Sequence, residues 1–148
     1  MKNKHLSYDE RLEIESGLKD NLSFKQIAKN IDRDCTTISK EIKNHIIFKN
    51  SGAVGRSFFD CLHRYNCPYK KKGKKCISKL CEHYKKESCE KLKKPPYVCN
   101  GCSKRNICTL SKQLYDSLML LKNIKIIYKK LEQELRIQKK KLNISTIS

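Results

Sequence analysis

The residues of this chain that are best suited to chemistry are its cysteines. Nine occur in 148 residues, and eight of them gather in the middle of the sequence: Cys61, Cys67, Cys76, Cys81, Cys89, Cys99, Cys102 and Cys108. The stretch that holds them has few large aliphatic side chains, so a hydrophobic core alone could not keep it folded. Thiolates that meet at a tetrahedral Zn²⁺ would supply the missing folding free energy.

The spacing of these cysteines favours structural zinc but leaves alternatives open. Cys99 and Cys102 have the spacing of a metal knuckle, and Gly101 between them lets both sulfurs turn to one ion. Eight thiolates would fill two four-sulfur sites, although His63 and His83 could replace some of them. Free thiols and disulfides are the alternatives. The N-terminus lacks the apolar segment of a signal peptide, which indicates the reducing bacterial cytoplasm and disfavours disulfides.

A second set of residues is suited to contacts with double-stranded DNA. Short hydrogen-bonding side chains followed by cations suit base edges first and phosphates next. The set is Arg33, Thr36, Thr37, Ser39, Lys40, Lys43 and Asn44. We predict that all seven contact DNA and that Thr37, Ser39, Lys40 and Lys43 face the major groove or its walls.

The elements that must position this set are two short helices within Ser23–Asn44. Ser23 and Gln26 have the spacing of a capping box, and apolar residues then recur at helical spacing up to Ile31. Residues 32–34 favour a turn, after which Ile38 and Ile42 face back toward the first helix. The pattern predicts a helix-turn-helix unit. An ordinary helical hairpin in a small core is the alternative.

A third helix completes this unit at its N-terminal side. Ser7 and Glu10 form another capping box, and the helical pattern runs to about Lys19. The predicted core of the three helices is Leu12, Ile27, Ala28, Ile31, Ile38 and Ile42. Cys35, far from the other cysteines, is interpreted as a small structural residue.

The predicted fold class is mainly α, in five consecutive parts. They are a helix-turn-helix domain (1–50), a linker (51–60), a cysteine-rich basic segment that we expect to bind zinc (61–110), a long helix (111–142) and a tail (143–148). The sequence also indicates a short strand at Ile46–Lys49. The long helix has an apolar stripe from Leu114 to Leu135 without a partner in the chain, which predicts a homodimer.

The net charge of +19 indicates a polyanionic partner. Residues 1–50 hold 10 Lys and Arg against 8 Asp and Glu, residues 51–110 hold 15 against 4, and residues 111–148 hold 9 against 3. Lysines beside tyrosines at 69–75 and 84–86 suit phosphate contact with occasional stacking. A merely solvated basic surface is the alternative. No apolar run is long enough to cross a membrane.

Three blocks of sequence resemble the N-terminal region of transposases of the insertion-sequence-thirty family. They are HLSYDERLEIESGLKDNLSFKQIAKNIDRDCTTISKEIKN, CLHRYNC and KLKKPPYVCNGCSKRNICTLSKQLYD. The resemblance covers residues 4–135, and Cys35 stands where the family often has proline. It implies recognition of the terminal inverted repeats of a transposable element, with full-length transposase as a further partner.

In that family a second helix-turn-helix and an RNase-H-like catalytic domain with two Asp and one Glu follow this region. Here the resemblance stops near Arg136, so we expect a truncated transposase that is not itself an enzyme. After Cys108 the only carboxylates are Asp116, Glu132 and Glu134, all within a helical pattern. The alternatives are a transcriptional regulator or self-repressor of the element, and an interaction module that assembles or poisons transposase complexes.

Overall fold

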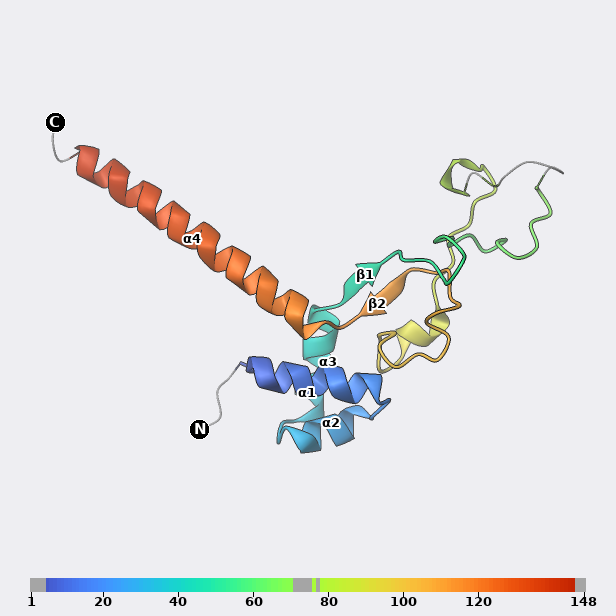
Figure 1. The fold of residues 1–148 in the computed structure, drawn as a ribbon, viewed down its shortest axis with the longest axis horizontal. Helices are drawn as coiled ribbons and strands as arrows, with labels where there is room; N and C mark the ends of the chain where they lie inside the picture. The colour runs from blue at the N-terminus through green and yellow to red at the C-terminus, as the bar shows by residue number, and fades with distance from the viewer. Residues whose placement is uncertain (1–4, 71–75, 77, 146–148) are drawn as a thin grey trace.

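Figure 1 shows a small helical body from which one long helix projects on one side and cysteine-rich loops on the other. This computed structural model describes residues 5–70, 76 and 78–145. The described part contains four α-helices, which are α1 (Tyr8–Lys19), α2 (Phe24–Asn30), α3 (Cys35–Asn44) and α4 (Ser117–Ser145). The mainly helical fold class is confirmed.

Both predicted capping boxes are present at the starts of α1 and α2. The hydroxyl of Ser7 accepts the Glu10 N–H at 3.1 Å, and the Glu10 carboxylate accepts the Ser7 N–H at 2.7 Å. Ser23 and Gln26 repeat this reciprocal arrangement. Each box satisfies two donors that a helix start leaves without intrahelical partners.

Both helices also end in the same way. Asn21 and Asp32 follow α1 and α2 with φ of 58° and 51°. In each case the N–H of the next residue bonds a carbonyl five positions earlier at 2.9 Å, which is the pattern of a Schellman motif. Asn and Asp tolerate this left-handed conformation better than other residues with a side chain. Two polar residues thus set the sharp turns between the three helices.

The core of the three-helix unit confirms most of the predicted residues. Its most buried side chains are Ile14, Leu18, Ile27, Ala28, Ile38 and Ile42. Leu12 was predicted wrongly: it is 41% exposed. The inward face of α1 carries Ile14 and Leu18 instead, which are four residues apart and therefore share a face. Ile31 is only partly buried and packs against the edge of the core.

Gly17 explains how α1 and α2 approach each other closely. A Cβ atom at this position would lie 2.7 Å from Cγ1 of Ile27. The residue that weakens the helical pattern of α1 therefore makes room for a core side chain of α2.

A two-stranded antiparallel sheet follows α3. Strand β1 (Ile47–Lys49) pairs with β2 (Lys112–Leu114), with Ile47 opposite Leu114. The strand indicated near residue 47 is confirmed. The predicted start of the long helix at residue 111 is wrong, because residues 112–114 belong to this sheet.

Helix α4 begins only at Ser117 and extends beyond its predicted end, to Ser145. The Asp116 carboxylate accepts the Met119 N–H at 3.0 Å, as an N-cap side chain does. Leu120 is buried in the core, whereas large side chains from Ile126 onward are exposed. The helix is about 44 Å long and leaves the body after its first turns (Figure 1).

Contacts across the predicted boundary at residue 50 tie the parts together. Val98, Tyr115 and Leu120 join the buried cluster of the three-helix unit. Two 3₁₀ turns, η1 (Ser78–Leu80) and η2 (Glu90–Lys93), are the regular elements of the cysteine-rich segment among its described residues. None of the helices in the described ranges is apolar over a length that would span a bilayer.

Candidate nucleic-acid interface

Helix α3 is positioned by a cap at its start and by two side chains on its inner face. The Asp34 carboxylate accepts the Thr36 N–H at 2.7 Å and the Thr36 hydroxyl at 2.6 Å. These hydrogen bonds lower the pKa of Asp34. Ile38 and Ile42 are fully buried, so the opposite face of α3 is directed outward.

The outward face carries most of the residues predicted to contact DNA. Four of them are exposed: Thr36, Lys40, Lys43 and Asn44. Thr37 and Ser39 are half-buried at the margins of this face. One helix therefore presents a polar and basic surface. The Thr36 hydroxyl on this surface donates a hydrogen bond to Asp34.

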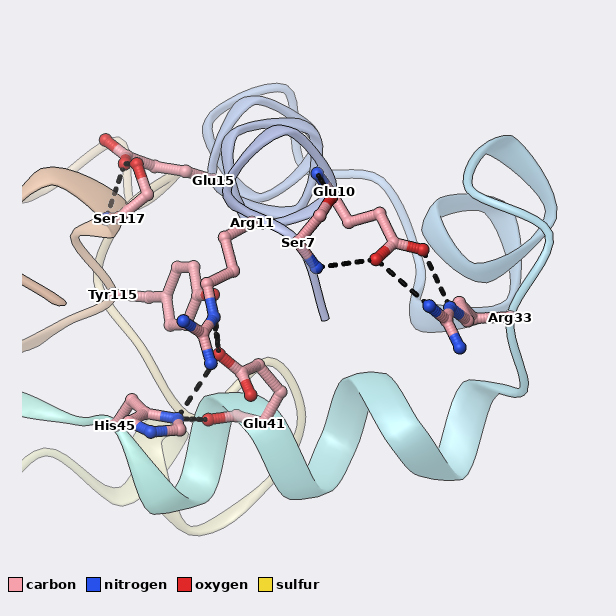
Figure 2. A network of polar contacts seen from close by, with 9 residues as sticks. All are labelled: Ser7, Glu10, Arg11, Glu15, Arg33, Glu41, His45, Tyr115 and Ser117. Carbon is pink, nitrogen blue, oxygen red and sulfur yellow. Dashed lines mark hydrogen bonds and ion pairs between the residues drawn. The ribbon is translucent and has the colours of Figure 1, made fainter. Parts of the chain in front are cut away.

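Arg33 lies in the turn between α2 and α3 and is held by α1. Its Nε donates to Glu10 Oε1 at 2.7 Å and its Nη2 to Glu10 Oε2 at 3.1 Å (Figure 2). The hydrogen bond from Arg33 is the main reason that the pKa of Glu10 is lowered. The position of Arg33 indicates that it fixes the turn, which the sequence pattern did not reveal.

A second polar cluster braces the C-terminal half of α3, as Figure 2 shows. Arg11 Nε donates to Glu41 Oε1 at 2.8 Å, and the hydroxyl of Tyr115 donates to the same oxygen at 3.1 Å. Burial raises the pKa of Tyr115, and the charge of Glu41 raises it further. Tyr115 comes from the segment after β2, so residues far along the chain help to orient α3.

The start of α4 is fastened to α1 by a carboxylate. Glu15 accepts the backbone N–H of Ser117 at 2.9 Å and its hydroxyl at 2.6 Å (Figure 2). Burial raises the pKa of Glu15, but hydrogen bonds from Lys19 and Ser117 outweigh it, so the pKa is lowered. A negative charge at a helix N-terminus is stabilising.

Tyr97 adds an aromatic ring to the edge of this surface. Lys43 Nζ lies 4.5 Å from the centre of the Tyr97 ring, within the range of a cation–π contact. The same ring lies 6.1 Å from that of Phe24. The sequence pattern did not predict that Tyr97 lies beside α3. The only indication in the sequence was the position of this tyrosine two residues before the Cys99–Cys102 pair.

The cysteine-rich segment packs directly on the helix-turn-helix unit. Asn100 donates to the carbonyl of Tyr115 at 2.7 Å and accepts its N–H at 2.9 Å. A Cβ atom on Gly101 would lie 2.5 Å from the Leu18 carbonyl oxygen and 2.3 Å from Asn21 Oδ1. Only glycine allows the knuckle to approach α1 so closely.

The predicted metal ligands divide into two groups in space. Cys89, Cys99, Cys102 and Cys108 line one pocket of about 510 Å³. Burial raises the pKa of the Cys99 thiol, and the three other thiols raise it further. Among the residues that the structure describes, however, no three Cys, His, Asp or Glu side chains stand close enough to hold an ion as they are.

The other four predicted ligands lie along the outer loops. Cys61 is buried and pairs with Lys86 in a β-bridge, whereas Cys76 is exposed. His63 and His83 both contact the ring of Tyr69, with His83 stacked at 3.8 Å. Cys67 and Cys81 are half-buried. No disulfide joins any of the nine cysteines, all of which belong to the described residues, and Cys35 is exposed.

The lysines predicted to contact phosphate are only partly described. Lys70, Lys85 and Lys86 are exposed. The remainder of that cluster, at 71–75, lies outside the described residues.

Comparison with known proteins identifies the N-terminal unit. Residues 2–45 match a family model described as a helix-turn-helix domain, the kind of domain that places its second helix in the DNA major groove. No curated protein and no solved structure matches the chain. The match covers α1, α2 and α3, and with them all seven predicted DNA-contacting residues.

Proposed function

We propose that this chain binds double-stranded DNA sequence-specifically through α3, and that its target is the terminal inverted repeat of an insertion sequence. The observation that carries the proposal is the exposed polar and basic face of α3 opposite the buried Ile38 and Ile42. The helix-turn-helix match supports DNA as the ligand. Domains of this type occur at the N-termini of transposases, which supports the transposon end as the target.

The charge of the molecule supports the same ligand. The chain carries +19, and Lys40 and Lys43 stand next to the short polar side chains of α3. Cations at these positions would contact phosphates, while Thr37 and Ser39 would reach base edges. In this arrangement Arg33 orients α3 indirectly, because its guanidinium group fixes the turn before α3 by donating to Glu10.

We also propose that two copies of the chain pair through α4. Leu121, Tyr128, Leu135 and Leu142 recur every seven residues, and Ile124 and Leu131 stand three residues after the first two. From Leu121 to Leu142 this heptad is continuous within α4, whereas Leu118 stands out of register near the start of the helix. A parallel pair would also place Glu134 beside Lys139 of the partner subunit.

Such a pair would hold two helix-turn-helix units at the same end of the paired helices. Two units related by two-fold symmetry suit a DNA site with two half-sites. A transcriptional regulator that represses its own element would use the same arrangement, and it is the second candidate. The two differ in where the bound DNA lies, at the ends of an element or over a promoter.

The test begins with selection of bound sequences from random DNA by the purified chain, followed by footprinting on the DNA that flanks its gene. Protection of inverted repeats is the expected result, and protection confined to a promoter would favour the regulator. Lys43→Ala should weaken binding to all sequences and lower the salt slope by about one. Thr37→Ala and Ser39→Ala should change which sites are preferred.

Lys129→Ala is the charge-matched control, since Lys129 lies exposed on α4 away from the body. It should leave both affinity and site preference close to those of the unaltered chain. If substitutions at Thr37, Ser39, Lys40 and Lys43 all behave like this control, α3 does not read DNA.

A further inference from the structure

The residues that line the pocket between η2, the Cys99–Cys102 turn and the start of β2 include four cysteines and a buried lysine. The cysteines are Cys89, Cys99, Cys102 and Cys108, and the lysine is Lys112. We propose that these four cysteines, without the other four, bind one Zn²⁺ at this pocket. The inference does not depend on the proposed DNA target.

Three short turns bring the four cysteines to the pocket. The Cys102 N–H donates to the Cys99 carbonyl at 3.1 Å, which closes the knuckle. Cys89 immediately precedes η2, and the Cys108 N–H donates to the Lys104 carbonyl at 3.0 Å. The backbone at each thiol is therefore tied in place, and zinc binding requires the side chains to turn toward the centre of the pocket.

Lys112 is the second observation that points to an anionic centre. Lys112 is only 4% exposed. Among the described residues its Nζ donates to three neutral oxygens: Ser51 Oγ at 3.2 Å, the Cys108 carbonyl at 3.0 Å and the Gly52 carbonyl. A buried cation without a negative partner is costly.

Zinc held by four thiolates would supply that negative partner. Four thiolates and one Zn²⁺ leave a net charge of −2, and a tetrahedral set of sulfur ligands selects zinc over hard cations such as Mg²⁺ or Ca²⁺. Lys112 bonds the carbonyl of one proposed ligand, Cys108, so it would act just outside the ligand sphere. Such contacts around a metal site tune its affinity.

The site would also secure the contact between the knuckle and the DNA-binding unit. Gly101 lies inside the knuckle and packs against α1, while Asn100 fixes Tyr115 under α3. Zinc binding at the knuckle would therefore stabilise the surface that supports α3.

The first experiment measures the zinc content of the full-length chain, purified under reducing conditions. Cys99→Ser and Cys108→Ser should each lose one equivalent relative to the unaltered chain. Cys35→Ser should lose none, because Cys35 is exposed at the start of α3 and does not line the pocket. Full zinc content in both pocket variants would overturn the proposal.

A second experiment uses the unaltered chain, so it does not depend on the folding of variants. Thiol alkylation mapped by mass spectrometry, with and without Zn²⁺, should show protection of Cys89, Cys99, Cys102 and Cys108. Cys35 should react equally in both cases. Absence of protection at these four, or protection of only the other four, would overturn the assignment.

The role of Lys112 has its own test. Lys112→Met should raise the zinc dissociation constant by about tenfold. Lys104→Met, which removes an exposed charge at the rim of the same pocket, should change it much less. Equal affinities in the two variants would overturn the role given to Lys112.

Discussion

At the scale of single residues, the outward face of α3 is defined by what its inner face buries. Ile38 and Ile42 have no exposed surface, and both belong to the cluster shared with Ile14 and Ile27. A change in these side chains would therefore act on the orientation of the DNA-contacting residues as well as on stability.

Ile38→Ala should lower the free energy of unfolding by about 2–4 kcal/mol, because it leaves a cavity in a small core. Leu12→Ala is the control: Leu12 is 41% exposed, so its truncation should cost only about 0.5 kcal/mol. Denaturant unfolding of the full-length chain measures both. Equal losses would mean that α1 turns a different face toward the core.

Arg33→Ala should destabilise the chain at neutral pH, by less than Ile38→Ala, because it removes both hydrogen bonds to Glu10. The pKa of Glu10 is lowered in the folded state, chiefly by Arg33. The interaction therefore stabilises the fold above the unfolded-state pKa and is lost as pH falls through the folded-state pKa.

The difference between Arg33→Ala and the unaltered chain should accordingly shrink in acid. Unfolding measured at neutral pH and well below the ordinary pKa of glutamate checks this. Glu10→Gln provides the matched variant, and in its background Arg33→Ala should have a smaller effect. A difference that is constant with pH would show that the ion pair contributes nothing to stability.

At the scale of elements, the knuckle at Cys99–Cys102 and α1 form one packed contact. Gly101→Ala should lower the free energy of unfolding by about 1–3 kcal/mol, because its Cβ would meet the Leu18 carbonyl and Asn21. Ser103→Ala, at an exposed position of the same turn, should have little effect. Thermal unfolding of both variants would decide whether the knuckle is docked on α1.

The projecting part of α4, by contrast, packs against no other element of the described structure. Leu131 and Leu135 are 49% and 57% exposed, and pairing with a second copy would bury them. Leu131→Glu should convert the dimer to a monomer in sedimentation at micromolar concentration. Ile126→Glu places the same charge on the side of the helix away from the heptad and should leave the dimer intact. A monomeric unaltered chain would refute the pairing.

At the scale of the whole molecule, the carboxylates that follow Cys108 do not converge within the described residues. Asp116 caps α4, while Glu132 and Glu134 are exposed on the same helix. A two-metal transposase site requires carboxylates that converge. We therefore expect the chain to bind DNA without cutting it.

Incubation with a supercoiled plasmid that carries the inverted repeats, in the presence of Mg²⁺ or Mn²⁺, tests this expectation. The plasmid should remain supercoiled while a mobility shift shows that the chain is bound. A variant with Lys40→Ala and Lys43→Ala controls for contaminating nuclease. Nicking by the unaltered chain that disappears in this variant would show that a catalytic site has been overlooked.

Local interactions account for what could be predicted from sequence. The capping boxes at Ser7 and Ser23 and the inward isoleucines of α3 depend on residues three or four positions apart, so their spacing specifies them. The two polar residues that end α1 and α2 act equally locally. For the same reason the outward set on α3 could be identified before its surroundings were known.

Long-range contacts decided the rest. Residues 112–114 have a helical pattern, but pairing with β1 turns them into a strand and moves the start of α4 to Ser117. Leu12 and Ile14 are both apolar, and only the packing of α1 on α2 and α3 selects Ile14 for the core. Other contacts also join residues that are distant in sequence: Tyr115 bonds Glu41 of α3, Tyr97 lies beside Lys43, and four cysteines line one pocket with Lys112. The spacing of residues along the chain does not predict such contacts, since they form only when separate elements pack together.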